Sequence, residues 1–125
     1  MKIVVFDTET TGLPKYKNSS IYKTDDWPYI IQLSYIIYDM VSNTMEIVDD
    51  YVDIPEDVKI PEESFKIHGI TNEMCRKGIS IQEALSKFVT YIKDCDIIIG
   101  HNVSFDKRMI IVEGIRNKQN IFLKD

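Results

Sequence analysis

The sequence predicts an α/β fold built on a mixed sheet, and three patterns support this prediction. Residues 3–6 are apolar at every position, and residues 29–39 and 46–54 roughly alternate between apolar and polar side chains. Residues 81–92 have apolar side chains at helical spacing, and a second apolar run follows at residues 96–100. A strand that follows a crossover helix pairs in parallel with an earlier strand. We therefore expect three antiparallel strands, a helix, a parallel strand and a second helix.

Length and composition fit one globular domain. The chain has 125 residues, of which 44% are hydrophobic and 28% are charged, and this excludes disordered and fibrous classes. Its net charge is −5, so any contact with a polyanion must be local. Cys75 and Cys95 lack metal-ligand spacing and are expected to be reduced, partly buried thiols. The apolar run at the N-terminus is too short for a signal peptide or a membrane span, so we expect a cytoplasmic protein without membrane contact.

The first strand is expected at residues 3–6, because an uninterrupted apolar run is typical of a central strand that is covered on both faces. Residues 14–28 (PKYKNSSIYKTDDWP) follow as a polar, turn-rich connection. Long connections of this kind are often functional, so we expect this segment to border the site. Residues 29–39 and 46–54 then form an antiparallel hairpin, with the turn formers Ser42-Asn43 between them.

The second half of the sequence predicts short helical turns, a crossover helix, a strand and a final helix. Residues 55–78 are broken by Pro61, Gly69 and Gly78 into short pieces. The crossover helix begins at a capping box of Ser80 and Glu83, and its apolar stripe consists of Ile81, Ala84, Leu85, Phe88 and Ile92. A buried strand at residues 97–99 precedes a helix over residues 104–117, with Ser104 as its cap and an apolar stripe of Phe105, Met109, Val112 and Ile115.

Three acidic residues are expected at the carboxyl ends of the two apolar strands. Asp7 and Glu9 follow the first run, and the period-two geometry of a strand directs both carboxylates to the same side of the sheet. Asp106 follows the second run in the first turn of the next helix, near His101 and Asn102. Ligands of open α/β sheets bind at this edge. Adjacent carboxylates there either share a proton or bind a hard divalent cation, and we favour the cation over a pair of solvated acids.

Four segments resemble the landmarks of the DnaQ-like DEDD 3′→5′ exonucleases, in their histidine-bearing (DEDDh) branch. Residues 6–13 (FDTETTGL) match the first exonuclease motif, and residues 100–106 (GHNVSFD) contain the second. Residues 30–34 (IIQLS) and 67–71 (IHGIT) are similar to segments between them. The resemblance implies a ribonuclease H-like sheet and two divalent cations, Mg²⁺ or Mn²⁺, which activate water and stabilise the leaving 3′ oxygen. It also implies release of nucleoside monophosphates from the 3′ end of single-stranded DNA or RNA.

The same resemblance assigns roles to individual positions. Asp7 is similar to the residue that bridges both metals, Glu9 to a ligand of the metal that activates water, and Asp106 to a ligand of the other metal. The positions expected to contact the substrate are Thr10, Leu13, His68, His101, Asn102 and Phe105. Structural roles remain open for His68, Phe105 and His101. As a partner besides nucleic acid, the resemblance implies a polymerase or another replication or repair assembly.

One family landmark is absent from this sequence. The third motif, His-x-x-x-x-Asp, supplies the general base and the fourth carboxylate in the family, and no histidine follows Asp106 here. We therefore expect residues 1–125 to form a single exonuclease-like domain that lacks its C-terminal part. Weak or no activity is expected of the isolated chain, because general acid–base assistance contributes about 10²–10⁴ in rate.

Two other functions remain as alternatives. A haloacid dehalogenase-like phosphatase also has an Asp-x-Asp-x-Thr sequence after an apolar strand, but Glu9 replaces the second aspartate and the next elements predict a hairpin instead of a helix. A non-catalytic nucleic-acid-binding or scaffolding module would keep the acids as a remnant metal site without turnover.

The connection at residues 14–28 adds a separate expectation. Its aromatic residues Tyr16, Tyr22 and Trp27 alternate with Lys15, Lys17 and Lys23. Aromatic rings stack on bases and lysines contact phosphates, so this mixture is suited to holding a single strand. Packing of Trp27 under the hairpin is the alternative.

Overall fold

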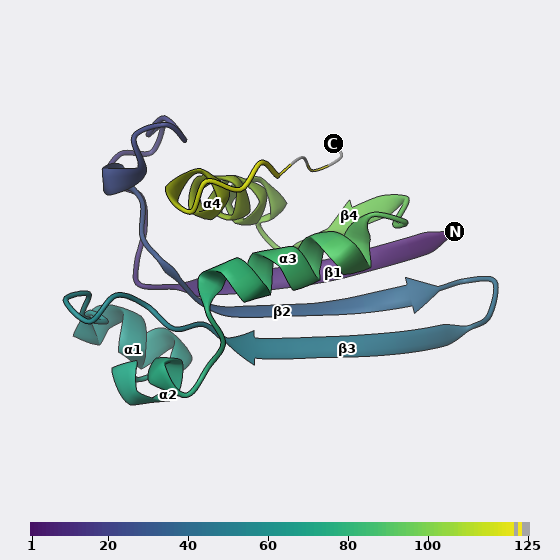
Figure 1. Ribbon diagram of the computed structural model, residues 1–125, viewed down its shortest axis with the longest axis horizontal. Helices are drawn as coiled ribbons and strands as arrows, with labels where there is room; N and C mark the ends of the chain where they lie inside the picture. Colours follow the sequence, from purple (N-terminus) through teal and green to yellow (C-terminus); the bar gives the residue numbers. More distant parts are fainter. Residues whose placement is uncertain (122, 124–125) are drawn as a thin grey trace.

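An open four-stranded sheet forms the centre of the computed structural model, which describes residues 1–121 and 123 (Figure 1). The strands are β1 (Lys2–Thr10), β2 (Ile30–Asp39), β3 (Thr44–Tyr51) and β4 (Ile97–Ile99). The helices are α1 (Glu62–His68), α2 (Asn72–Arg76), α3 (Ile81–Ile92) and α4 (Val103–Arg116), and a 3₁₀ turn η1 spans Thr24–Asp26. This order of elements confirms the predicted α/β fold.

The strands have the order β3-β2-β1-β4, which makes β1 and β2 the inner strands. Val5 of β1 lies opposite Ile36 of β2, and Ile36 lies opposite Ile47 of β3, in antiparallel pairs. β4 runs parallel to β1, with Ile99 opposite Val5. The predicted hairpin and the predicted parallel strand after a crossover helix are both confirmed, so the sheet is mixed.

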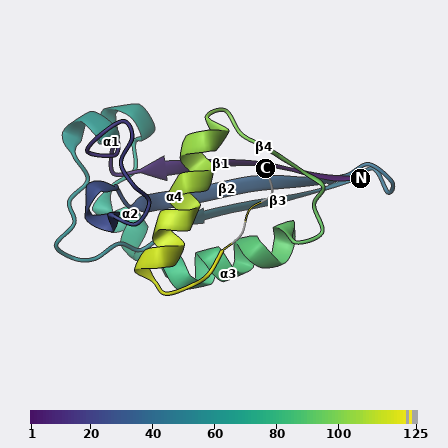
Figure 2. The same cartoon turned by 90° about the horizontal axis from the view of Figure 1, so that it is seen from above.

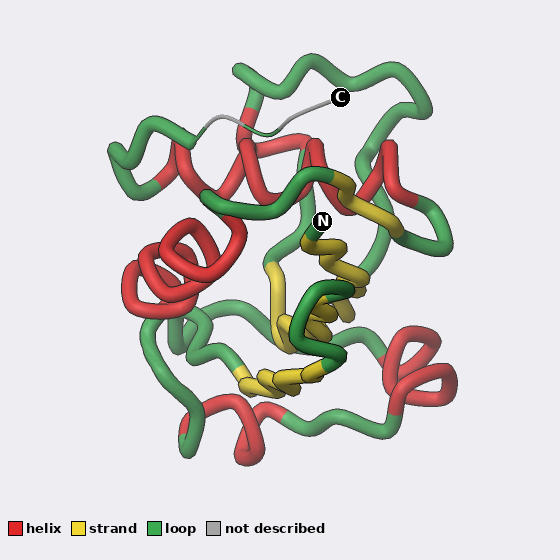
Figure 3. Tube along the Cα trace, turned by 90° about the vertical axis from the view of Figure 1, so that its right-hand side faces the viewer, coloured by secondary structure: helices red, strands yellow, loops and turns green. Residues whose placement is uncertain are grey.

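The two long helices, α3 and α4, lie on the same side of the sheet (Figures 2 and 3), and α1 and α2 lie at the end where β1 ends and β2 begins. Phe6 is 1% exposed beneath the helices, whereas its neighbour Val5 is 43% exposed on the opposite side, here called the open face. Ile99 of β4 is 45% exposed. The prediction that both apolar runs are covered on both faces is therefore wrong, because both long helices pack on one side.

The core between the sheet and α3 follows the predicted stripe. The side-chain oxygen of Ser80 accepts a hydrogen bond from the backbone N–H of Glu83 at 3.1 Å, so the predicted cap is present. Phe88 lies at the centre of the core, with its ring centroid 5.2 Å from that of Phe6 and 5.0 Å from that of Tyr35. The buried residues of α3 are Ala84, Leu85, Phe88 and Ile92.

Helix α4 differs from its prediction at the cap and in its buried face. Its N-cap is Asn102, which makes no side-chain capping bond, and Ser104 lies inside the helix. Met109 and Val112 are buried as predicted, but Phe105 and Ile115 are only partly buried. The buried set also includes Asp106, Ile110, Glu113 and Gly114. This face is wider than one apolar stripe because α4 packs against both β1 and η1.

The long connection before β2 contains a buried aromatic residue. Trp27 is 4% exposed, and its ring stacks on Phe105 of α4 with the centroids 6.2 Å apart. Direct stacking of Trp27 on a nucleic-acid base is therefore excluded in this conformation. The ring packs against α4 and not under the hairpin, since the connection folds back over the helix side of the sheet (Figure 1).

The segment between β3 and α3 contains two short helices, as predicted. Gly69 ends α1 in the left-handed conformation, with φ of 70°. A Cβ atom on Gly78 would lie 2.2 Å from the carbonyl oxygen of Tyr51, so this close approach requires glycine. Cys75 and Cys95 are both buried and do not form a disulfide with each other. Among the helices described by the structure, none combines the length and the apolar character needed to cross a membrane.

Candidate active site

The acidic pair lies on the open face at the end of β1. Asp7 and Glu9 are two positions apart in the strand, so both carboxylates are on the same side, as predicted. Asp7 lies opposite Ser34 of β2, and Glu9 lies opposite Gln32. The carboxylate of Asp49 in β3, which is not one of the predicted site residues, lies on the same face. It accepts hydrogen bonds from Ser34 at 2.6 Å and from Gln32 at 2.8 Å. The open face therefore has an acidic and polar end.

Asp106 reaches β1 from the helix side. Its carboxylate is 3% exposed and accepts a hydrogen bond from the hydroxyl of Thr8 at 2.6 Å. Thr8 lies between Asp7 and Glu9 in the strand, with its side chain on the opposite face. The three acids are therefore supplied by neighbouring positions of β1 and by the first turn of α4, as the sequence predicted. Thr8 joins the two elements.

The charges of these acids are not neutralised by basic side chains. Within residues 1–121 and 123, Asp7, Glu9 and Asp106 form no ion pair with a lysine or arginine. Burial, followed by the charge of Asp7, raises the pKa of Glu9 above its usual value. Burial also raises the pKa of Asp106, and Asp7 adds to this, whereas the hydrogen bond from Thr8 lowers it. A bound cation would relieve this repulsion.

The donor set suits Mg²⁺ or Mn²⁺, because these hard cations prefer carboxylate oxygens and water. The three carboxylates do not form one tight ligand group, however. In the described part of the chain, no three His, Cys, Asp or Glu side chains come close enough together to hold a single ion. The chemistry of the residues therefore fits divalent cations, which would take their remaining ligands from water and a substrate phosphate.

A cleft of about 460 Å³ adjoins Glu9. The end of β1 and the residues that follow this strand form one wall of the cleft, and α1 forms another. Phe105 of α4 completes the cleft. Ser64 of α1 donates a hydrogen bond from its hydroxyl to the carbonyl oxygen of Thr11 at 3.0 Å, which joins these two walls. The full lining consists of Thr8, Glu9, Thr10, Gly12, Leu13, Glu63, Ser64, Ile67, His68 and Phe105.

His68 supplies the cleft with an available hydrogen-bond donor. Its Nδ1 accepts the backbone N–H of Ile70 at 3.0 Å, so a neutral ring carries its proton on Nε2. Nε2 is buried and has no hydrogen-bond partner in the described structure. His68 is the last residue of α1, and its Nε2 is available to a ligand in the cleft. A ligand oxygen in the cleft would complete its hydrogen bonding.

The other predicted contact residues divide into two groups. Thr10, Leu13 and Phe105 line the cleft, and Phe105 also packs against Trp27, so its functional and structural roles are compatible. His101 and Asn102 lie on the exposed turn before α4 and do not line the cleft. The backbone N–H of Asp106 donates to the carbonyl oxygen of Asn102 at 3.1 Å, so this turn adjoins Asp106.

Sequence reasoning missed Thr8 and the α1 residues Glu63, Ser64 and Ile67. Strand alternation places Thr8 opposite the acids, but its contact with Asp106 depends on where α4 packs. Glu63 and Ser64 precede the segment at 67–71, and nothing in their order distinguished them from residues of an ordinary short helix; Ile67 belongs to that segment but was not assigned to the site. Only the packing of α1 against the end of β1 brings them to the cleft.

An open mixed sheet with acids at the end of its first strand and a cleft beside them is the arrangement expected of a ribonuclease H-like α/β domain. The RNase T family model, described as an exonuclease family, matches residues 4–124. The chain therefore belongs to the DnaQ-like DEDD exonuclease family. The haloacid dehalogenase-like interpretation is not supported, because the family match and the hairpin after β1 both oppose it.

Sequence relatives include subunits of DNA polymerase III. The chain is 34% identical over 105 residues to the PolC-type DNA polymerase III of Pediococcus pentosaceus, a match of 84% of this chain and 6% of the relative. It is 32% identical over 114 residues to the DNA polymerase III subunit epsilon of Buchnera aphidicola subsp. Baizongia pistaciae, covering 88% of this chain and 42% of that subunit. The chain thus spans less than half the length of these relatives.

Solved structures share the fold at lower sequence identity. Exonuclease I of E. coli in complex with a dT13 oligonucleotide matches with a TM-score of 0.74 and 19% identity, over 95% of this chain and 24% of that chain. The nuclease domain of 3′hExo, a DEDDh family member bound to rAMP, matches with a TM-score of 0.70 and 11% identity, over 95% of this chain and 60% of that domain. These matches confirm the predicted ribonuclease H-like sheet.

Proposed function

We propose that this chain is the exonuclease domain of a 3′→5′ exonuclease, which hydrolyses phosphodiester bonds at the 3′ end of DNA or RNA and releases nucleoside monophosphates. The observation that best supports this is the group of acids at the end of β1 beside the cleft, where Nε2 of His68 has no hydrogen-bond partner among the described residues. Family membership of residues 4–124 supports the same chemistry.

In this proposal Asp7, Glu9 and Asp106 hold two divalent cations, Mg²⁺ or Mn²⁺. Bound cations would lower the pKa of a water molecule and neutralise negative charge on the phosphate. Thr8 is a positioning residue, because its hydroxyl donates to Asp106 at 2.6 Å and so orients that carboxylate. The raised pKa values of Glu9 and Asp106 indicate that both carboxylates gain stabilisation from a cation.

The terminal nucleotide occupies the cleft. The Nε2–H of His68 donates a hydrogen bond to a substrate oxygen, and Phe105 and Leu13 pack against the base or sugar. The hydroxyl of Thr10 donates to the carbonyl oxygen of Gly12 at 2.6 Å and thereby shapes the backbone before Leu13. His101 and Asn102 contact the strand outside the cleft.

The test is a 3′-labelled single-stranded oligonucleotide, incubated as DNA and as RNA with Mn²⁺ or Mg²⁺. We expect slow release of nucleoside monophosphates, which stops in EDTA and in the variant Asp7→Asn. Asp49→Asn is a matched control, because Asp49 is an exposed acid on the same face outside the cleft. Robust release by Asp7→Asn would contradict the assignment of the acids.

A non-catalytic nucleic-acid-binding or scaffolding module with a remnant metal site is the second candidate. One observation favours it: within the described residues, the acids do not form a three-residue ligand group. Calorimetric titration with Mn²⁺ and with oligonucleotide separates the two functions. Binding of both without release of mononucleotides would favour the module, whereas metal-dependent release supports the enzyme.

The domain also acts within a larger replication or repair assembly in this proposal. The sequence relatives are a PolC-type DNA polymerase III and an epsilon subunit of DNA polymerase III, which supports a polymerase as the partner. A cytoplasmic location belongs to the same proposal.

A further inference from the structure

We propose that residues 13–23, here called the Lys/Tyr loop, form a second binding surface for the single-stranded nucleic acid whose 3′ end occupies the cleft. This inference rests on the proposed exonuclease function and extends it from the terminal nucleotide to the preceding part of the strand. Four features support it: the positive charge of the loop, its exposed tyrosine rings, its position next to the cleft, and the hydrogen bonds that hold it to the core.

The Lys/Tyr loop is a basic segment of an acidic protein. Its sequence LPKYKNSSIYK contains three lysines and no acid, so it carries a charge of +3 in a chain of net charge −5. In the described structure, Lys15, Lys17 and Lys23 are exposed and form no ion pair with an acidic residue. Their charges are therefore available for phosphate groups. Because the whole chain is acidic, a nucleic acid can be attracted only by a local basic segment such as this one.

The loop also has two exposed tyrosine rings. Tyr16 is 57% exposed and Tyr22 is 78% exposed. The ammonium group of Lys15 lies 5.6 Å from the centroid of the Tyr16 ring. Aromatic faces and lysines next to one another bind single strands with little sequence preference, because every base has a face that can stack.

The loop is continuous with the cleft. Leu13 lines the cleft, and the three lysines and two tyrosines follow within ten residues of it. In Figures 1 and 2, the connection between β1 and β2 lies at the same end of the sheet as α1, which forms another wall of the cleft. A strand that leaves the cleft at Leu13 therefore meets the Lys/Tyr loop.

Hydrogen bonds within the connection hold the loop in one shape. The hydroxyl of Ser19 donates to the carbonyl oxygen of Tyr16 and accepts the backbone N–H of the same residue, both at 2.9 Å. The indole N–H of Trp27 donates to the carbonyl oxygen of Ser20 at 3.0 Å. Since Trp27 is buried against Phe105, these contacts join the exposed loop to the core.

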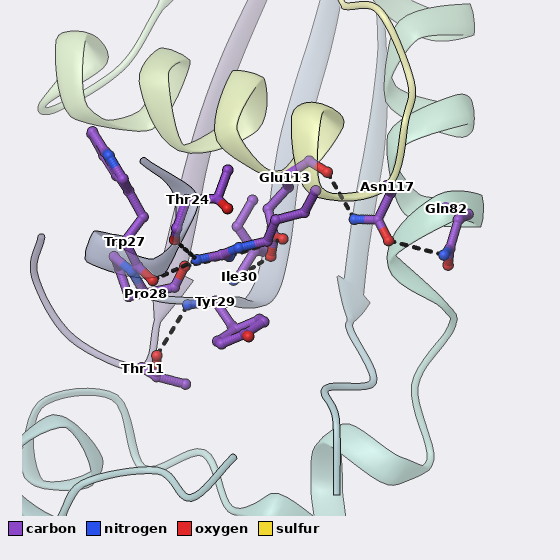
Figure 4. Close-up of polar contacts among 10 residues, drawn as sticks. Thr11, Thr24, Trp27, Pro28, Tyr29, Ile30, Gln82, Glu113 and Asn117 are labelled. Carbon is purple, nitrogen blue, oxygen red and sulfur yellow. Dashed lines mark hydrogen bonds and ion pairs between the residues drawn. The ribbon is translucent and has the colours of Figure 1, made fainter. Parts of the chain in front are cut away.

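A buried ion pair of α4 holds the other end of the connection (Figure 4). The guanidinium of Arg116 donates to the carbonyl oxygens of Thr24 and Pro28, both at 2.7 Å, and to that of Trp27. Glu113 accepts a hydrogen bond from Arg116 at 3.1 Å and from the backbone N–H of Ile30 at 2.9 Å. The loop is thus presented on a rigid base, which lowers the entropy lost when a strand binds.

The experiment measures binding of a fluorescein-labelled 12-nucleotide strand, as DNA and as RNA, by anisotropy in EDTA, so that no hydrolysis occurs. In Tyr16→Ala/Tyr22→Ala we expect affinity for the strand to fall by at least about fivefold per tyrosine. Affinity for a nucleoside monophosphate, which reaches only the cleft, should stay unchanged.

The lysines are tested by salt dependence. In Lys15→Gln/Lys17→Gln/Lys23→Gln, the slope of log K against log salt concentration should decrease by about 2, since each phosphate contact on a single strand contributes about 0.7. The matched control replaces three other exposed lysines, Lys59, Lys77 and Lys93, and changes the net charge equally. A much smaller change of slope is expected for it.

The outcomes separate the two proposals. If the loop variants bind the strand as the parent does, with the same salt slope, the Lys/Tyr loop is not a binding surface, and the exonuclease proposal is unaffected. If the control triple variant reproduces the loss, the effect is one of net charge and the loop proposal is overturned. If the parent binds neither strand nor mononucleotide even when Mn²⁺ replaces EDTA, the proposed function fails, and the loop proposal fails with it.

Discussion

Both faces of the sheet carry apolar side chains, but only one face is covered by helices. On the face beneath α3 and α4, Val4, Phe6 and Leu33 are at most 1% exposed, whereas on the open face Ile47 is 68% exposed and Ile97 is 39% exposed. β-Branched side chains occupy both faces of β1 and β4. The difference teaches that an apolar strand sequence indicates a position within the sheet, while burial depends on which side the helices pack.

The open face is itself divided along the strands. Asp7 and Glu9 lie near the carboxyl end of β1, next to Ser34 and Gln32. Towards the other end, the strand pairing aligns two apolar rows, Ile97, Ile3, Tyr38 and Met45 in one and Ile99, Val5, Ile36 and Ile47 in the other. Strand direction therefore places Asp7 and Glu9 at the end of β1 that leads to the cleft, and the apolar rows lie towards the other end.

Of the four comparisons, two phenylalanines should show the largest difference in the free energy of unfolding lost on substitution. Phe88 is fully buried at the centre of the core, and Phe65 of α1 is 43% exposed. Phe88→Ala should lower the free energy of unfolding by about 3–5 kcal/mol, and Phe65→Ala by about 1 kcal/mol or less. Urea unfolding of both variants measures this. Equal losses would contradict the assignment of the core to the helix side.

The buried ion pair beneath the connection allows a similar comparison. Arg116→Met leaves the buried Glu113 carboxylate without its partner and should cost about 3–5 kcal/mol. Lys66→Met breaks the exposed pair with Glu62 and should cost at most about 0.5 kcal/mol. Thermal unfolding at one pH compares them. A small loss for Arg116→Met would mean that the carboxylate is readily hydrated or protonated there.

Adjacent valines of β1 provide the sharpest matched pair. Val4 is completely buried and Val5 is on the open face. Val4→Thr places a hydroxyl in an apolar core and should cost about 1–3 kcal/mol, whereas Val5→Thr should change stability by less than about 0.5 kcal/mol. If Val5→Thr were as costly as Val4→Thr in urea unfolding, the open face would be covered in solution.

The smallest effect is expected in the pH dependence of stability. Burial raises the pKa of Glu113 above its usual value of 4.5, although Arg116 opposes this. The folded state therefore keeps a proton that the unfolded state releases, and the free energy of unfolding falls as the pH rises from about 4.5 through the raised pKa. This fall should be smaller in Glu113→Gln, as measured by urea unfolding at several pH values. If the free energy of unfolding depended on pH identically in the parent and in Glu113→Gln, the raised pKa of Glu113 would be contradicted.

Much of the fold could be predicted because its signals are local. The hairpin depends on alternation within two segments, the start of α3 depends on Ser80 and Glu83, and the common side of Asp7 and Glu9 depends on strand geometry. The role of Glu113 could not be predicted, because a glutamate in a helix is usually exposed, and its burial depends on Arg116 and on the backbone of residues 24–30.

The sequence by itself determined the order of the elements, the acidic pair on one side of β1, and the family to which the chain belongs, since each of these resides in residues that are close together in the chain. Only the tertiary structure decided that one face of the sheet is open, that Thr8 holds Asp106, and that α1 completes the cleft at His68. These features depend on the packing of elements that are far apart in sequence, and packing is determined by the combined burial of many side chains and not by any one segment.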